Sequence, residues 1–506
     1  MRSLDLAVIL VYLAAITWFG ARFRHGQRNL RDYFLGGRTA PWWAICLSIV
    51  SAETSTLTIV GTPALSFAGN LGFLQIVFGY LLARIVISLL LLPHYFRGEM
   101  FTAYELMRRR FGENVRKATA GTFLVARSLA EGVRVFAISL VISIVLGTGE
   151  VSSIVLITLL TLFYTFEGGM TAVIWTDVVQ MCLYVAGALV SFFVILGMIP
   201  GGWEHVAAVA GPAGKFQIFD FHFAPTMAFF SQPYTFWAGI AGGCFLTTAS
   251  HGTDQLMVQR LLSARNEVQS RVALMASWAV IFFQFCLFLV IGILLFVHYG
   301  DLHLAAPAQT DRIYPAFIWQ NLPPGVAGLV IAAILAAAMA NLSAALNSLA
   351  STTVVDFYRP LAPRHDEAHY LRLARLATVA WGLVLLAIGI MARKWGSVLV
   401  AGLTIASIPF GALLGVFLLG VLTRRVGQRA ALAGIAAGLA VIIYVRFLTP
   451  IAWTWYVLIG ATVTFLCGLA ASLVEGPPPA AYAGVPAPLN ALPHRPPERA
   501  AADPEE

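Results

Sequence analysis

The feature that most limits what this chain can fold into is a recurring apolar run of about 20 residues, long enough to cross a hydrocarbon layer of roughly 30 Å. Such runs occur thirteen times along the 506 residues. Hydrophobic residues make up 59% of the chain and charged residues 11%, whereas a soluble domain is about one quarter charged. The sequence therefore predicts an all-α polytopic membrane protein built as one transmembrane unit.

The thirteen expected spans have boundaries that are approximate to a few residues. They cover residues 4–23, 41–66, 70–95, 118–147, 152–167, 171–199, 229–251, 272–298, 325–352, 373–392, 397–421, 430–447 and 453–474. We expect five regions: an extra N-terminal helix with a basic loop (1–40), a first five-helix repeat (41–199), a second, inverted five-helix repeat (229–421), two C-terminal helices (422–474) and a disordered cytoplasmic tail (475–506). The tail is rich in proline and alanine, a composition typical of disorder.

Positive charge is concentrated in every second loop. The loops after the first, third and seventh spans hold basic residues such as Arg24, Arg28, Arg31, Arg108 and Arg260. Because cytoplasmic loops carry the excess of lysine and arginine, this pattern places the N-terminus outside and the C-terminus in the cytoplasm. The net charge of +8 follows from this topology and does not indicate a nucleic-acid partner.

The second span carries polar residues where hydrocarbon is expected. Glu53 lies near its middle beside Ser51, Thr54 and Ser55, and Gly61-Thr62-Pro63 follows as an expected helix break. A carboxylate inside a membrane span is costly and is by default a candidate functional residue. Glycine and proline are also common in transmembrane helices, so one such break alone fits either a packing kink or a site.

A second interrupted span is expected at residues 236–255, five spans later. The expected helix breakers are Gly239, Gly242 and Gly243. The hydroxyls of Thr247 and Ser250 add polarity to the same span. The two segments cross in opposite directions, so the two sets of five spans form an inverted pair. Paired broken spans in matching places indicate the midplane site of a secondary transporter. Carbonyl and hydroxyl oxygens released there are ligands for a small cation.

Four motifs in order carry a resemblance to a known family. They are DYFLGGRTAPWW (32–43), EGGMTAVIWTDVVQ (167–180), HGTDQLMVQRLLSARN (251–266) and the alanine-rich segment at 322–358. At these residues the chain resembles the sodium/solute symporters, which have the LeuT-type inverted-repeat fold with broken first and sixth core helices. The resemblance implies sodium-driven uptake of a small organic solute, and for a bacterial member a place in the inner membrane.

The resemblance also implies a sodium site between the first broken helix and the span at 325–352. Its ligand positions would be Ser51, Thr54, Ala337, Ala340 and Asn341. The family usually has two adjacent hydroxyls at the last two positions. Here alanine offers none and asparagine offers one carbonyl oxygen, so Ser343 or Glu53 would have to complete the site. Sodium is the only coupling ion expected from the resemblance, and no cofactor is expected.

Asp177 matches a family position that is either a second ion site or an exit relay. The alternative is an interface residue bonded to nearby hydroxyls. Arg127, Glu131 and Arg134 share one helix face by their spacing. They form either a buried charge ladder, with Arg84 joining another acid, or a clamp in which one surplus guanidinium binds a solute carboxylate.

The leading hypothesis is a secondary active symporter that is not an enzyme. Its solute would bind near Glu53, Ser55, Thr247 and Ser250, with Arg127 and Arg134 as clamp residues, and would be anionic if the clamp holds. Proton coupling is the alternative within transport, and a non-transporting membrane sensor is the alternative of another class. The sequence shows no HExxH or GxSxG motif of an intramembrane enzyme. A monomer in the lipid bilayer is expected.

Overall fold

A computed structural model describes residues 3–22, 38–97, 103–164, 170–358, 361–362 and 367–475. Several features of the sequence lie outside these residues. They are Arg24, Arg28 and Arg31 of the first basic loop, the first half of the first motif (32–37), the start of the second motif (167–169), and the tail from residue 476 onward.

The described residues form helices joined by loops. The α-helices are α1 (Ser3–Ala21), α3 (Trp42–Glu53), α4 (Thr56–Ala68), α5 (Leu74–Val86), α6 (Leu92–Tyr95), α7 (Ala103–Phe111), α8 (Glu113–Leu146), α9 (Glu150–Tyr164), α10 (Met170–Met198), α11 (Gly202–Ala210), α12 (Met227–Phe230), α13 (Phe236–Gly252), α14 (Gln255–Leu262), α15 (Glu267–Asp301), α16 (Ile313–Asn321), α17 (Val326–Thr352), α19 (Glu367–Ala392), α20 (Val398–Leu422), α21 (Gln428–Leu448) and α22 (Tyr456–Glu475). The short π- and 3-10 turns are η3 (Ile87–Leu91), η4 (Thr310–Arg312), η5 (Thr353–Tyr358) and η6 (Trp453–Trp455). Within these ranges the structure contains no strand, only an isolated bridge between Ala40 and Ala264. The all-α prediction is confirmed.

The number of membrane spans differs from the predicted thirteen. Among the described residues, nine helices are long and apolar enough to cross a membrane, or ten when the bent pair α3–α4 counts as one span. The other three expected spans coincide with α1, α9 and α13, which are real helices but do not meet those limits of length and composition. The count of thirteen is therefore not confirmed.

The first helix break lies earlier than predicted. α3 ends at Glu53 and α4 begins at Thr56, with a bend of 63° between them. Gly61 and Pro63 lie inside α4. A side chain at Gly61 would meet the Leu399 Cβ of α20 at 2.6 Å, so this glycine permits close helix packing and does not interrupt the helix.

The glycines of the second expected break have the same packing role. α13 is continuous across Gly239, Gly242 and Gly243 and ends only at Gly252. A Cβ on Gly243 would lie 2.2 Å from the Ile76 carbonyl oxygen of α5, so the glycines let α13 and α5 pack with their backbones in contact. The chain breaks after α13, at Thr253–Asp254, before the short helix α14.

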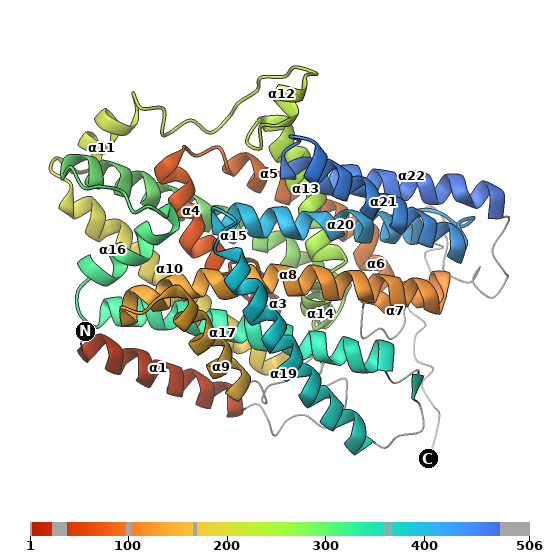
Figure 1. Cartoon of the computed structure of the whole chain (residues 1–506). Coiled ribbons are helices and arrows are strands. Elements are labelled where there is room, and N and C mark those ends of the chain that lie inside the picture. Colours follow the sequence, from red (N-terminus) through yellow and green to blue (C-terminus); the bar gives the residue numbers. More distant parts are fainter. Residues whose placement is uncertain are drawn as a thin grey trace, which may run out of the picture.

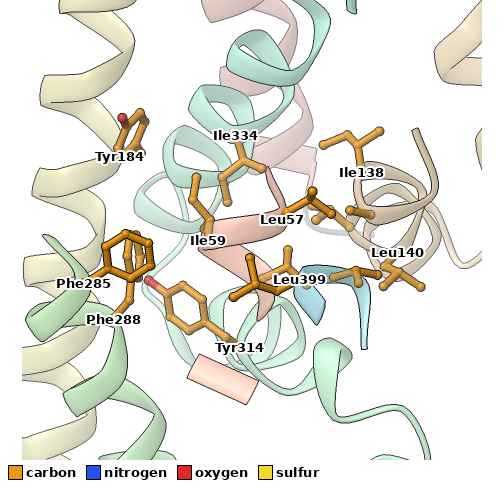
Figure 2. Packing of buried hydrophobic residues seen from close by; sticks show 14 of the residues in the cluster. Leu57, Ile59, Ile138, Leu140, Tyr184, Phe285, Phe288, Tyr314, Ile334 and Leu399 are labelled. Carbon is orange, nitrogen blue, oxygen red and sulfur yellow. The ribbon is translucent and has the colours of Figure 1, made fainter. Parts of the chain in front are cut away.

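The second half of the broken helix lies at the centre of the bundle. Figure 2 shows Leu57 and Ile59 of α4 among Ile138 of α8, Phe285 of α15 and Ile334 of α17, and all five belong to one buried apolar cluster. Burial on every side is what lets a helix with no capping side chain at Ser55 stay in place.

Two outer elements complete the bundle. α21 and α22 pair with each other and with α20 on one side (Figure 1). α1 lies against α17 on another side, where the buried Asp5 carboxylate accepts hydrogen bonds from the backbone amides of Gly325 (2.6 Å) and Gly328 (2.9 Å). A carboxylate at this place stabilises the start of α17, because the first amides of a helix have no partner within the helix.

Candidate transport site

The break between α3 and α4 releases backbone oxygens in the interior. The Ser55 amide donates to the Glu53 carbonyl (3.1 Å) in place of the Ser51 carbonyl, and the Thr58 amide donates to Ser55 (2.9 Å) in place of Thr54. The carbonyls of Ser51 and Thr54 thus lose their usual helix donors. Both residues are buried, at 2% and 0% exposed. These are two of the three backbone ligands expected for sodium.

A small cavity opens beside this break. Its lining includes Ser55 at the break, Thr56 from α4, Glu131 and Arg134 from α8, and Asn341 from α17. Three helices that are far apart in the sequence therefore contribute polar side chains to one space. Of the residues predicted for solute or ion binding, the structure brings Ser55, Arg134 and Asn341 together here.

The charged pair in the cavity wall has unused hydrogen-bonding capacity. A terminal nitrogen of Arg134 binds one oxygen of Glu131. Within the described part of the chain, the Nε of Arg134 and the second carboxylate oxygen of Glu131 are buried without a hydrogen-bond partner. An unpaired buried donor and an unpaired buried acceptor are costly, and a polar ligand in the cavity would satisfy both.

Arg127 contacts two carboxylates. Its guanidinium lies 2.7 Å from the Glu131 carboxylate and 3.8 Å from that of Asp254, at the start of α14. The predicted surplus of one positive charge is therefore wrong, because Asp254 provides a second acid and the two arginines face two carboxylates. Arg127 is not among the residues that line the cavity, although it contacts the same Glu131 oxygen as Arg134.

Glu53 is already paired with positive charge. Its carboxylate lies 2.6 Å from Arg84 of α5 and 3.3 Å from the His251 ring of α13. Arg84 is fully buried and also donates to Ser277 (3.0 Å). Arg84 pairs with an acid, as predicted, and that acid is Glu53. The sequence predicts Glu53 as an ion- and solute-binding residue.

Two hydroxyls predicted for the solute lie on this side of α13. Ser250 is 2.9 Å from the His251 ring and donates to the Thr247 carbonyl (3.4 Å). Neither Thr247 nor Ser250 is among the lining residues of the cavity. Ser250 is linked to Glu53 indirectly, through the His251 ring.

Asp177 lies in a closed ion pair that the sequence did not reveal. Ser48 donates to its carboxylate at 2.6 Å and Arg260 at 3.0 Å. Arg260, expected in a cytoplasmic loop, is 2% exposed on α14 and also donates to Ser48 (3.0 Å) and to the Leu256 carbonyl (2.9 Å). The loop assignment of Arg260 is wrong, because α14 folds back into the bundle and carries the guanidinium with it.

The remaining sodium positions lie on α17. Ala337 and Asn341 are buried, at 4% and 8% exposed, and Ser343 is half-buried outside the cavity lining. The backbone of Ala340 lies in α17, and its side chain is outside the described part of the structure.

Two polar residues next to the break were not predicted from the sequence. Gln284 of α15 is 1% exposed and accepts a hydrogen bond from the Thr54 hydroxyl at 3.0 Å. Tyr184 of α10 interacts with the side chains of Ser51 and Thr54. A lone amide in the apolar span 272–298 was the available signal for Gln284, since polar groups within a span are usually bonded to another helix.

Comparison with known proteins identifies the family. The model of the sodium:solute symporter family matches residues 33–438, which is most of the chain. This chain belongs to the sodium:solute symporter family. The chain is 30% identical to the human sodium/iodide cotransporter over 458 residues, covering 87% of this chain and 68% of that protein.

Two further relatives cover most of the chain. It is 27% identical over 478 residues to the sodium/sialic acid symporter NanT of Aliivibrio fischeri, covering 92% of both chains, and 28% identical to human sodium-coupled monocarboxylate transporter 1, covering 87% of this chain and 72% of that protein. A solved structure of a Na+-coupled sialic acid symporter in an outward-open state superposes with a TM-score of 0.81 at 26% identity, over 94% of this chain and 98% of that one. The predicted LeuT-type fold is confirmed, and the protein is a membrane transporter of a sodium-coupled family and not an enzyme.

Proposed function

We propose that this symporter couples inward sodium flow to the uptake of a small organic anion through alternating access. The observation that carries the proposal is the cavity beside the helix break, which Ser55, Arg134 and Asn341 line together and where the Nε of Arg134 is buried without a partner among the described residues. Half-helix ends at the midplane are the places where such transporters bind solute and ion together.

The solute class follows from the two unpaired atoms in the cavity wall. The Nε of Arg134 is a donor suited to a carboxylate, and the free oxygen of Glu131 is an acceptor suited to a hydroxyl or ammonium group. A carboxylic acid that also carries a donor group, such as a hydroxy acid or an amino acid, satisfies both. The substrates named for the three relatives, iodide, monocarboxylates and sialic acid, are all anions.

For the ion, we propose sodium between the Ser51 and Thr54 carbonyls on one side and Ala337 and Asn341 on the other. A carbonyl oxygen of Asn341 would replace one hydroxyl of the family pattern. Glu53 and Asp177, each paired with an arginine, would act by holding α3 in position. Proton coupling remains the alternative, because a proton needs only one basic oxygen whereas sodium takes several.

Uptake into proteoliposomes tests the proposal. Radiolabelled monocarboxylates, amino acids, sialic acid and iodide are offered under an inward sodium gradient, under a pH gradient without sodium, and under neither gradient. We expect uptake of a carboxylate that requires the sodium gradient. Uptake that follows the pH gradient and ignores sodium would replace sodium by protons, and binding without any uptake would favour a sensor.

We also propose the inner membrane as the location, with the N-terminus outside and the C-terminus in the cytoplasm. The basic loops support this orientation. Accessibility of an introduced cysteine to an impermeant reagent in intact cells decides it, with one site at His303, after α15, and one at Arg424, after α20.

A further inference from the structure

The loop that follows α11 carries a row of exposed phenyl rings. Phe219, Phe221 and Phe223 are 40%, 61% and 61% exposed. The rings of Phe219 and Phe221 are stacked, with centroids 5.4 Å apart and planes at 17°. In an extended chain, alternate residues point to the same side, so the intervening Asp220 and His222 belong to the other side. We call residues 215–223 the strap.

The phenyl row continues a lipid-facing surface. Phe219 stacks on Phe78 of α5 with centroids 5.7 Å apart. Phe78, Leu82, Ile85 and Leu89 follow one another along a single helix face, and the last three are 43%, 38% and 51% exposed. Because α5 opens a helix long and apolar enough to cross the membrane, this exposed apolar stripe faces lipid, and the strap extends it at the end of the span.

The polar side of the strap is held by the protein. The Asp220 amide donates to the Gln75 side chain (3.0 Å), and the same amide group of Gln75 donates to the Tyr234 carbonyl (2.7 Å). The Asp220 carbonyl accepts a hydrogen bond from Phe236 at the start of α13 (2.7 Å). These contacts fix the strap backbone against α5 and α13. The rings of Phe221 and Phe223 pack on Phe236 (centroids 4.8 Å apart) and Trp237 (5.9 Å) of α13 and remain 61% exposed.

The strap is also fastened to the broken helix. The Lys215 ammonium donates to the Phe67 carbonyl at the end of α4 (2.7 Å) and lies 4.1 Å from the centre of the Phe296 ring. Lys215 is only 7% exposed. The Gln217 carbonyl accepts a hydrogen bond from Leu71, just beyond α4 (3.1 Å). A cation at a helix C-terminus stabilises its last carbonyls.

We propose that the strap is a membrane-interface anchor: Phe219, Phe221 and Phe223 lie in the lipid headgroup and upper acyl region of the adjacent leaflet, and Lys215 ties this anchor to the end of α4. Phenylalanine, tryptophan and leucine on the apolar face of interfacial segments insert to the boundary between headgroups and acyl chains. The continuity with the lipid-facing stripe of α5 identifies lipid as the occupant of this surface. Lipid contact at the strap therefore positions the second half of the broken helix.

Nitroxide labels on neighbouring strap residues test the inference. The five cysteines, all free among the described residues, are replaced, and single labels are placed by Phe221→Cys and, as matched control, His222→Cys. In lipid nanodiscs we expect the label at 221 to collide more with oxygen than with a water-soluble nickel complex, and the label at 222 to show the reverse. Both labels in water would overturn the proposal.

Further outcomes test whether lipid covers the strap and whether Lys215 ties it to α4. If both labels are shielded from both reagents, protein covers the strap, for instance a second copy of the chain, and the lipid assignment is wrong. If replacing the cysteines unfolds the protein, Phe221→Trp and His222→Trp in the natural chain are compared by the loss of fluorescence with brominated lipid. Lys215→Met should raise the mobility of the label at 221, and unchanged mobility would contradict the tie to α4.

Discussion

The two charged clusters around Asp177 and Glu131 differ in how completely they are satisfied. In the Asp177 cluster all three nitrogens of the Arg260 guanidinium donate, to Ser48, Leu256 and Asp177 itself. In the cavity wall, one atom of Arg134 and one of Glu131 have no partner within the described residues. Both clusters are buried ion pairs on core helices, and the second lines the cavity beside the helix break.

The difference separates structural charge from charge that is available to a ligand. A buried pair with all its hydrogen bonds made is destabilised by any change to one member. A buried pair with open positions is satisfied only when something else enters. Sequence alone ranked Asp177 and Arg134 together as candidate site residues, and the comparison distinguishes them by a property that can be tested.

The largest expected effect is on stability at Asp177. Asp177→Asn leaves the buried Arg260 without its counter-charge and should lower the free energy of unfolding by about 3–5 kcal/mol. The measurement is denaturant unfolding of the purified protein in detergent. Asp177→Leu combined with Arg260→Met should recover much of that loss, since an apolar pair needs no charge partner. If Asp177→Asn instead keeps its stability and changes the sodium dependence of uptake, Asp177 is an ion ligand.

The next effect concerns solute affinity at Arg134. Arg134→Gln removes the charge-assisted contact, which should cost about 2–5 kcal/mol of binding free energy. The half-saturating solute concentration should therefore rise on the order of thirtyfold or more. Arg127→Gln is the matched control on the same helix. It faces Asp254 and should lower stability while solute binding per folded molecule stays unchanged. Equal effects of both variants on stability alone would make the whole ladder structural.

A smaller effect is expected at the departure from the family pattern. Ala340→Ser restores a hydroxyl at a sodium position with little added volume. If sodium binds there, the added contact should improve the binding free energy of sodium by up to about 1 kcal/mol, and half-maximal uptake should need a lower sodium concentration. Uptake measured over a range of sodium concentrations gives the answer, and no change together with dependence on pH would favour proton coupling.

The smallest effect is a pH dependence of stability from Asp311, outside the spans. Its carboxylate accepts a hydrogen bond from the Val398 amide at the start of α20 (2.9 Å), and burial raises the pKa of Asp311 from 3.8 to about 6. The folded state then holds the proton more tightly than the unfolded state. Its contribution to stability is present at low pH and lost as the pH rises through about 6.

As the pH falls from 7 to 5.5, this group alone should therefore raise the free energy of unfolding by less than about 1 kcal/mol. Asp311→Asn keeps an acceptor for Val398 without a charge and should remove this part of the pH dependence. Melting temperatures of both proteins over this pH range measure the effect, and parallel curves for the two would show that Asp311 does not titrate there.

The pattern of apolar runs determined much about this protein. It predicted helices where the structure has them, because hydrocarbon requires every backbone group to be bonded within a helix. The four motifs predicted the family and the fold, and the polar run around Glu53 marked the right helix for the break. Ser55, Arg134 and Asn341 were found from residue type and position, and the structure places all three around one cavity.

Tertiary structure decided which polar residue meets which. By sequence, Gly61 and Gly243 are both expected to break a helix. In the structure both lie in continuous helices, against Leu399 and Ile76. The neighbouring helix determines whether a glycine bends its own helix or permits close packing. Arg260 was assigned to a loop by its sequence neighbours and lies buried against Asp177, and Asp254 cancelled the predicted surplus charge. These two charge pairs join residues more than 80 positions apart in the sequence, and a one-dimensional pattern contains no distance between them.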